Sequence, residues 1–198
     1  LTTAASNTAG FFDTGVAGYC AGGNDGSDLS RVDKISFPSD SKTTLSTGLS
    51  GARFDLAAFS NPSTAGYAAG GRESGSAVDT VDKFVFPSDS RSTLATGLSD
   101  ASRELGGFEN EGVAGYAAGG IRFGSTRVAT VDKFAFPSDS ASVLGTGMST
   151  PRGNIGDFAN PGVAGYVAGN ESTNLTVDKF AFPSDTRTTL RTGLSVQR

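Results

Sequence analysis

The pentapeptide Gly66-Tyr67-Ala68-Ala69-Gly70 recurs, with small changes, four times along the 198-residue chain. Its copies contain all four tyrosines, which are 48, 49 and 50 positions apart. Other motifs return around each copy in a fixed order: Val-Asp-Lys, then Phe-Pro-Ser-Asp, then Thr-Gly-Leu/Met-Ser and an arginine three or four residues later. A unit of about 49 residues that is repeated in this way indicates one domain over residues 1–198, built from copies of one supersecondary structure.

Each unit is expected to supply four short strands. Glycine, proline, serine and threonine interrupt the chain too often for long helices. In the second unit we expect strands near Phe59 and over residues 66–70, 81–86 and 92–98. The motif Phe-Pro-Ser-Asp at 86–89 is expected to form a turn, because proline fixes φ and the serine and aspartate side chains bond to nearby backbone amides. Four strands per unit in a ring of units describe a β-propeller.

The repeat is cut across the ends of the chain. Phe11 stands eight residues before Tyr19, while the fourth unit ends at Arg198 without a phenylalanine after it. We therefore expect residues 1–23 to complete the blade begun near 166–198 and to close a ring of four. The alternative is an incomplete ring that closes only by pairing with another chain. The glycine- and alanine-rich strand is expected to lie innermost, because a four-membered ring has a narrow centre.

These motifs resemble the kelch repeat, in which a hydrophobic strand ends in a Gly-Gly doublet. The doublet lies at 22–23, 70–71 and 119–120, and Asn170 replaces its second glycine in the fourth unit. The resemblance covers the whole chain, although the tryptophan of the family is missing and four blades are fewer than usual. It implies an all-β, four-bladed kelch-like β-propeller closed by the N-terminal strand joining the C-terminal blade. The sequence is also similar to kelch-type repeats of marine bacteriophage tail and surface proteins, which favours an extracellular, cell-surface or virion location.

Composition excludes several classes of function. The net charge is −4 and the basic residues do not cluster, which argues against a nucleic-acid partner. No apolar run approaches the ~18 residues of a membrane span, and the lone Cys20 excludes a disulfide within the chain. The absence of histidine excludes Ser-His-Asp triads and histidine-based zinc or copper sites. We therefore expect no catalytic residues, no metal and no cofactor; an enzyme would have to use two close carboxylates in one cleft.

The charged residues that recur in every unit are expected to be structural. They are the Asp-Lys pairs beginning at Asp33, Asp82, Asp132 and Asp178 and the arginines Arg53, Arg103, Arg152 and Arg198. Each arginine is expected to bridge to an aspartate of a neighbouring unit. A ring of arginines that binds a ligand is the alternative.

The repeat breaks down at the connection between Gly-Gly and Val-Asp-Lys. The connections at 24–31, 72–80, 121–130 and 171–176 differ in length and sequence, and equivalent loops of a propeller lie on one face. The oxygen-rich stretch 24–28 is interpreted as a turn rather than a calcium loop. The candidate binding residues are Asn24, Asp25, Asp28, Arg72, Glu73, Arg122, Phe123, Arg127, Glu171 and Asn174. Unconstrained solvent-facing loops are the alternative interpretation.

The sequence therefore predicts a non-enzymatic module for protein–protein interaction or structural assembly, which presents its variable loops on one face. A protein partner or an assembly neighbour is expected. The alternative is a lectin-like propeller that binds a glycan. A lectin would be expected to repeat an aromatic platform in each loop, and only Phe123 has that character.

Overall fold

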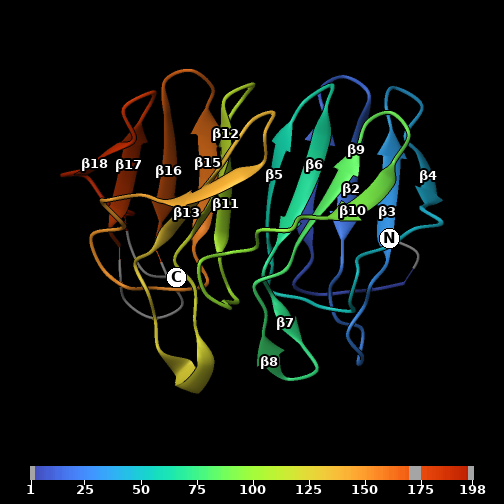
Figure 1. The fold of residues 1–198 in the computed structure, drawn as a ribbon, viewed down its shortest axis with the longest axis horizontal. Coiled ribbons are helices and arrows are strands. Elements are labelled where there is room, and N and C mark those ends of the chain that lie inside the picture. The colour runs from blue at the N-terminus through green and yellow to red at the C-terminus, as the bar shows by residue number, and fades with distance from the viewer. Residues whose placement is uncertain (1–2, 170–174, 196–198) are drawn as a thin grey trace.

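The computed structural model describes residues 3–169 and 175–195, which form four antiparallel sheets of four strands each (Figure 1). The first sheet consists of β1 (Ala9–Asp13), β2 (Ala17–Ala21), β3 (Val32–Ser36) and β4 (Ser41–Thr44). The second consists of β5 (Ala57–Asn61), β6 (Ala65–Ala69), β9 (Val81–Val85) and β10 (Ser90–Thr93). The third consists of β11 (Gly106–Asn110), β12 (Ala114–Ala118), β13 (Val131–Ala135) and β14 (Ser140–Val143). The fourth consists of β15 (Gly156–Asn160), β16 (Ala164–Ala168), β17 (Val177–Ala181) and β18 (Thr186–Thr189).

The predicted all-β class and the four strands per unit are confirmed. Two small elements are added in the variable connections: the hairpin of β7 (Arg72–Glu73) and β8 (Ser76–Ala77), and the single 3₁₀ turn η1 (Phe123–Ser125). The last strand of the second unit is shorter than expected, since β10 ends at Thr93 and not at Leu98. The amide of Leu98 instead donates to the carbonyl of Asp79, which draws this segment away from the sheet edge.

The predicted closure of a ring by the N-terminal strand is wrong. β1 pairs with β2 of its own sheet, with Phe11 opposite Tyr19, and the fourth sheet has its own first strand, in which Phe158 lies opposite Tyr166. The unit therefore begins at the phenylalanine, and residues 1–23 do not complete the sheet of residues 166–198. The reason is local: β1 and β2 are separated only by the turn at 14–16, so they form a hairpin at little entropic cost.

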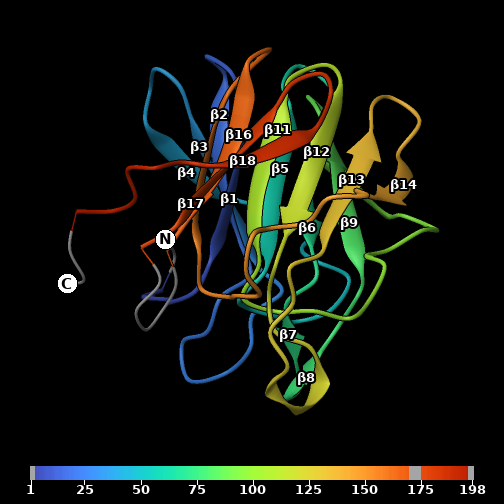
Figure 2. The same cartoon turned by 90° about the vertical axis from the view of Figure 1, so that its left-hand side faces the viewer.

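The glycine- and alanine-rich strand is second in each sheet, so its predicted innermost position is also wrong. The first strands contact one another in the order β1, β5, β11 and β15, and β1, β5 and β11 run through the middle of the view in Figure 2. The close approach of β5 and β11 depends on Gly107, because a Cβ at this position would overlap the backbone of Ala58. The glycine at the start of the second, third and fourth Gly-Tyr motifs instead makes room for a side chain of the preceding sheet.

A phenylalanine ring packed on a glycine joins each sheet to the next. A Cβ on Gly66 would overlap the ring of Phe11, and the same ring lies 5.4 Å from the ring of Phe84, centroid to centroid. The equivalent contacts join Phe59 to Gly115 and Phe134, and Phe108 to Gly165 and Phe180. All three phenylalanines are at most 2% exposed, so the hydrophobic core lies between the sheets. Burial of such a side chain contributes roughly 2–3 kcal/mol.

A polar cluster of tyrosine, lysine and aspartate accompanies each of these contacts. Tyr19 Oη donates to Asp89 Oδ1 over 2.7 Å, and Lys34 Nζ lies 2.7 Å from Asp89 Oδ2. The same cluster is formed by Tyr67 and Lys83 with Asp139, and by Tyr116 and Lys133 with Asp185. Burial and the neighbouring carboxylate raise the pKa of Tyr19 well above its ordinary value. The cluster explains why Gly-Tyr, Val-Asp-Lys and Phe-Pro-Ser-Asp return together, because each motif supplies one of the three partners.

No helix in the described parts of the chain has the length and apolar character needed to cross a lipid bilayer.

The glycine at each contact gives a test of the packing. We expect Gly115→Ala to lower the free energy of unfolding by about 1–3 kcal/mol, because the new methyl group overlaps the buried Phe59 ring. Gly18→Ala is the matched control: it is the same repeat position, but the nearest atom, Cζ of Phe37, lies 3.6 Å from the new Cβ. Urea denaturation measures both, and equal losses in the two variants would contradict this account of the packing.

Candidate functional site

The variable connections described by the structure leave the same end of the molecule, where the second strands end and the third strands begin (Figure 1, bottom). The first two are joined directly, because the amide of Ser74 donates to Asp28 Oδ2 over 2.9 Å. The predicted candidates Glu171 and Asn174 lie outside the described residues. The structure thus brings together the connections of the first three units.

The first connection is held by hydrogen bonds among its own polar groups. Asn24 Nδ2 donates to Asp28 Oδ1 over 3.1 Å, and Asn24 Oδ1 accepts from the amide of Gly26 over 3.0 Å. Asp25 Oδ2 accepts from the hydroxyl of Thr3 over 3.3 Å. These candidate residues therefore shape the loop and fix it to its surroundings.

The second connection lies against the segment that leads into β5. The guanidinium carbon of Arg72 lies 5.6 Å from the centre of the Phe54 ring, and the backbones of the two residues are hydrogen-bonded. The carboxylate of Glu73 lies so close to Gly51 that a Cβ there would overlap it. Arg72 and Glu73 are consequently half-buried and fix the β7–β8 hairpin in place.

The third connection projects one aromatic side chain into solvent. Phe123 is 94% exposed, the largest value among the exposed large hydrophobic residues of the described chain. Arg122 is anchored beside it, with its Nη2 2.7 Å from Asp100 Oδ2 and 3.1 Å from the Thr130 hydroxyl. The backbone of Arg127 pairs with that of Ile121 at the base of the loop. Of the predicted candidates, Phe123 is therefore the one most available to a partner.

A groove of about 180 Å³ separates the β7–β8 hairpin from the η1 turn. Its lining residues are Gly75, Ser76, Ala77, Arg103, Arg122, Phe123, Gly124 and Ser125. The groove therefore combines two arginines, one exposed aromatic ring and small polar groups. Sequence analysis identified Arg122 and Phe123 but placed Arg103 in the scaffold.

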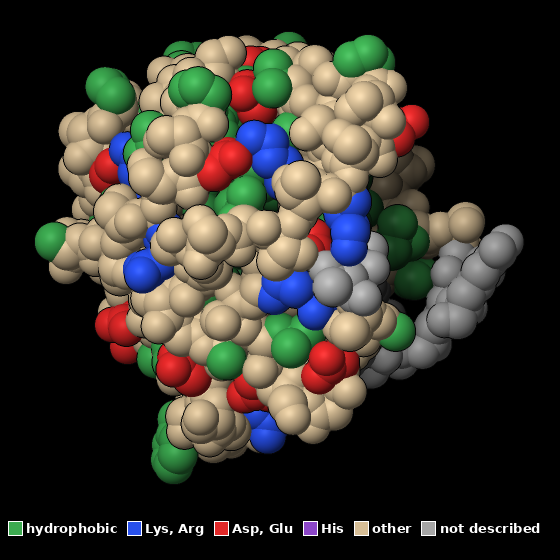
Figure 3. Space-filling view, turned by 90° about the vertical axis from the view of Figure 1, so that its right-hand side faces the viewer, with side chains coloured by type: hydrophobic (Ala, Val, Ile, Leu, Met, Phe, Trp, Pro, Cys, Tyr) green, Lys and Arg blue, Asp and Glu red, His purple; other side chains and the backbone are tan. Residues whose placement is uncertain are grey.

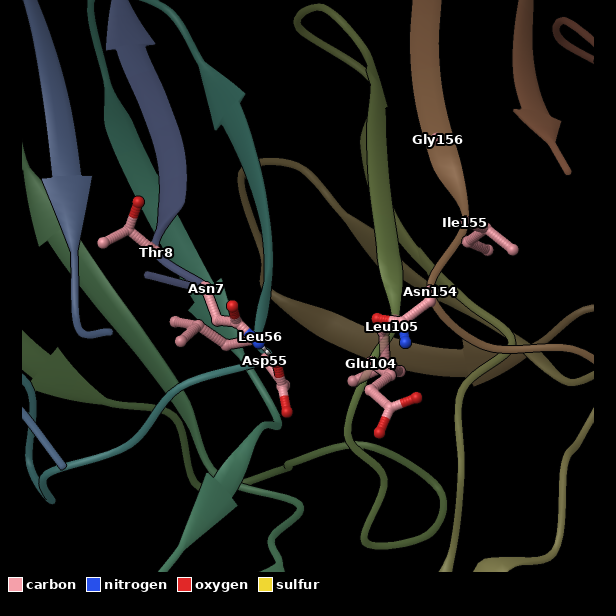
Figure 4. A pocket seen from close by; sticks show the side chains of 9 residues that line it. All are labelled: Asn7, Thr8, Asp55, Leu56, Glu104, Leu105, Asn154, Ile155 and Gly156. Carbon is pink, nitrogen blue, oxygen red and sulfur yellow. Dashed lines mark hydrogen bonds between the residues drawn. The ribbon is translucent and has the colours of Figure 1, made fainter. Parts of the chain in front are cut away.

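A second hollow, of about 380 Å³, lies where the first strands begin (Figure 4). Four polar residues line it at equivalent positions of the four units: Asn7, Asp55, Glu104 and Asn154. All four have positive φ, between 50° and 59°, and the amide of each of the last three donates to the carbonyl of the one before it. Sequence analysis missed this set, although alignment of the units shows a polar residue at this place each time.

A third hollow, of about 400 Å³, lies between the first strands and contains two carboxylates, Glu109 and Asp157, with the aromatic rings of Phe12 and Phe158. Burial, and then the negative charges of Asp157 and Glu111, raise the pKa of Glu109 to about 7, although the amide of Ser60 donates to it over 3.3 Å. Desolvation raises the pKa of Asp157 to about 6, although the amide of Gly107 donates a hydrogen bond to its carboxylate. Sequence analysis missed the carboxylate pair, because each acid occurs once at its repeat position and nothing in the sequence places the two together.

Two of the predicted arginine–aspartate bridges are confirmed. Arg53 Nη2 lies 2.9 Å from Asp82 Oδ2, and Arg152 Nη2 lies 2.9 Å from Asp178 Oδ2, with all four side chains fully buried. Each bridge ties the connection between two sheets to the sheet that follows. Arg198 lies outside the described residues.

The third predicted bridge is wrong, because Arg103 pairs with the adjacent Glu104 instead of Asp132. Burial consequently raises the pKa of Asp132, although hydrogen bonds from Ser99 and the charge of Arg122 act in the opposite direction. At the equivalent Asp82, burial is outweighed by the amide of Ser50 and the charge of Arg53, and the pKa is lowered. The bridge fails because Arg103 stands one residue later than Arg53 and Arg152 in the repeat: the carbonyl of Ser102 accepts from Gly71 as those of Arg53 and Arg152 accept from Gly23 and Gly120. Ser102 therefore takes the position of the bridging arginine in the second unit.

Comparison with known proteins gives no assignment: no protein-family model and no curated protein matches the sequence.

The buried aspartates lead to opposite predictions. Asp132→Asn should raise the free energy of unfolding at pH 7, because it removes a buried carboxylate whose charged form is disfavoured. Asp82→Asn should lower it by about 3–5 kcal/mol, because it leaves Arg53 buried without its counter-charge. Urea denaturation between pH 3 and 8 measures both effects, and each should shrink toward low pH as the wild-type carboxyls become protonated. Destabilisation by Asp132→Asn at pH 7 would contradict the inference.

Glu109 should make stability depend on pH. A carboxyl with a folded-state pKa of about 7 holds its proton more tightly in the folded state, so its contribution is greatest below its unfolded value and is lost as the pH rises toward 7. Glu109→Gln should therefore remove a fall in the free energy of unfolding on the order of 2 kcal/mol between pH 4.5 and 8. Glu111→Gln should reduce this fall only in part, because the charge of Glu111 is the smallest of the causes that raise the pKa of Glu109. Thermal or urea denaturation over this range is the measurement. An unchanged pH profile in Glu109→Gln would refute the assignment.

Proposed function

We propose that the protein is a non-enzymatic interaction or assembly module, built as a kelch-like propeller whose variable loops bind a protein partner. Four equivalent antiparallel sheets, joined in chain order through their first strands, support the propeller interpretation. In this interpretation each sheet is one blade, and the blade begins at the phenylalanine strand.

The convergence of three dissimilar loops around an exposed Phe123 is the observation that carries the proposed function. Loops of different length are free to differ in sequence, whereas the junction residues are repeated in nearly every unit. An aromatic side chain with arginines beside it is the composition favoured at the centre of protein interfaces. Arg122 is held in place by Asp100, so little of its side-chain entropy remains to be lost on binding.

Charge supports a protein rather than a nucleic-acid partner. Lys and Arg side chains alternate with Asp and Glu side chains on the face shown in Figure 3, and no continuous basic surface forms there. The chain as a whole carries a net charge of −4. A nucleic-acid site requires a concentration of positive charge that neutralises several phosphates.

The test is affinity capture from the source material, followed by binding measurements with the purified partner. Phe123→Ser should weaken binding by roughly 30-fold, the loss typical of a hot-spot side chain. Val113→Ser is the matched control, because Val113 is also an exposed apolar residue, 46% accessible, in the turn between β11 and β12 at the opposite end of the sheet. Equal binding by Phe123→Ser and wild type, or a loss in Val113→Ser alone, would refute the loop-face assignment.

Glycan binding is a second candidate, and the hollow between the first strands is the observation that favours it. Two carboxylates and two aromatic rings there, Glu109 and Asp157 with Phe12 and Phe158, are groups that hydrogen-bond and stack on sugars. A glycan array distinguishes the candidates. Binding that is lost in Asp157→Asn and kept in Phe123→Ser would establish the sugar site in place of the protein site.

A further inference from the structure

The first and the fourth sheets each carry one unpartnered half of a junction. Three junctions join the four sheets, and within the described residues no fourth set of ring, tyrosine and lysine contacts joins the fourth sheet to the first. In Figure 1 the fourth sheet extends to the left and the first to the right, with the second and third between them. The side between the fourth and the first sheets is therefore open.

The fourth sheet carries the half of a junction that contains the phenylalanine ring. Phe158 stacks on Tyr166 at 4.8 Å, as its equivalents do, but it is 57% exposed where Phe108 is 1% exposed. Lys179, which corresponds to Lys133, has no ion pair among the described residues. Asn160 is exposed, whereas its equivalent Asn110 accepts a hydrogen bond from the amide of Gly162 in the next sheet over 2.9 Å.

The first sheet carries the other half of a junction, which contains the glycine on which a phenylalanine ring would rest. Gly18 corresponds to Gly66, but no phenylalanine of a preceding sheet covers it. Phe37 is 46% exposed, whereas its equivalent Phe86 is 6% exposed against Phe11 and Tyr19. Asp40 has the same positive φ as Asp89 but is exposed and is in no ion pair of the described chain.

We propose that the open side is a site for one more four-stranded unit of the same repeat, which continues the chain order and packs between the fourth sheet and the first. Such a unit supplies a glycine for the ring of Phe158, an aspartate for Tyr166 and Lys179, and an amide for Asn160. At its other face it supplies a phenylalanine for Gly18 and a tyrosine and a lysine for Asp40. Each of these contacts already exists three times in the molecule.

One unit fits the open side better than a whole second molecule. A second copy would bring four sheets into a space flanked by both the first and the fourth sheets of this one (Figures 1 and 2). A unit that continues the chain also arrives on a short connection, like residues 94–105 between the second and the third sheets, which keeps the loss of entropy small. This proposal concerns the end sheets and is independent of the loop face.

A chain extended by one unit tests the proposal. Residues 153–198 are duplicated directly after Arg198, because Arg198 takes the repeat position of Arg152. In the 198-residue protein, Phe158→Ala should lower the melting temperature by no more than ~2 °C, because its ring is already exposed. In the extended chain the same change should lower it by roughly 10 °C, as Phe108→Ala does in both chains. Phe→Leu at both positions gives the same comparison if an alanine variant does not fold.

Two controls distinguish the occupants of the open side. Gly165→Val in the added copy alone should remove the effect of Phe158→Ala, because the valine fills the place of the ring.

The proposal is overturned if Phe158→Ala remains harmless in the extended chain. It is also overturned if Phe158→Ala is as damaging as Phe108→Ala in a monomeric 198-residue protein, which would mean that the first sheet of the same molecule covers the ring. A concentration-dependent dimer in light scattering that Phe158→Ala dissociates would identify a second copy as the occupant instead.

Discussion

A phenylalanine ring that rests on a glycine of the next sheet is the contact on which the rest of the molecule depends. The ring of Phe59 occupies the space that a side chain at Gly115 would fill, so the two sheets approach as closely as their backbones allow. This approach brings the hydroxyl of Tyr67 and the ammonium group of Lys83 to Asp139. Burial of the ring stabilises the contact between the sheets, and the directional polar contacts fix how one sheet is placed on the other.

This contact determines which residues of each unit are repeated and which vary. Residues that make the junction are nearly identical in every unit, because a change at one of them affects two sheets. The connections between second and third strands make none of these contacts, and they vary in length from unit to unit. The site proposed for a partner therefore lies where the chain is least constrained, and Phe123 is exposed there at no cost to the junctions.

Repetition allowed the strands, the turns and two of the arginine–aspartate bridges to be predicted, because each was observed several times in one sequence. The phase of the repeat was not predictable in the same way, since a cyclic pattern looks the same wherever the unit begins. Only the hairpin between β1 and β2 shows that Phe11 belongs with Tyr19. The carboxylates Glu109 and Asp157 were missed for the opposite reason, because each occurs once and they meet only when neighbouring first strands are side by side. Arg103 was misassigned because it lies one residue later in its unit than Arg53 and Arg152, so that Ser102 takes their position and Arg103 pairs with Glu104.

The nearest-neighbour character of the junctions has a consequence for how the chain folds. The tyrosine–aspartate hydrogen bonds connect residues 69 to 72 positions apart, so each junction closes a loop of nearly the same length. Loop-closure entropy depends on the logarithm of that length, and the three junctions are therefore nearly equal in this respect. The entropy of loop closure therefore favours none of the three junctions over the others. Folding is expected to nucleate at any of them and to spread in both directions along the chain, as in a one-dimensional lattice.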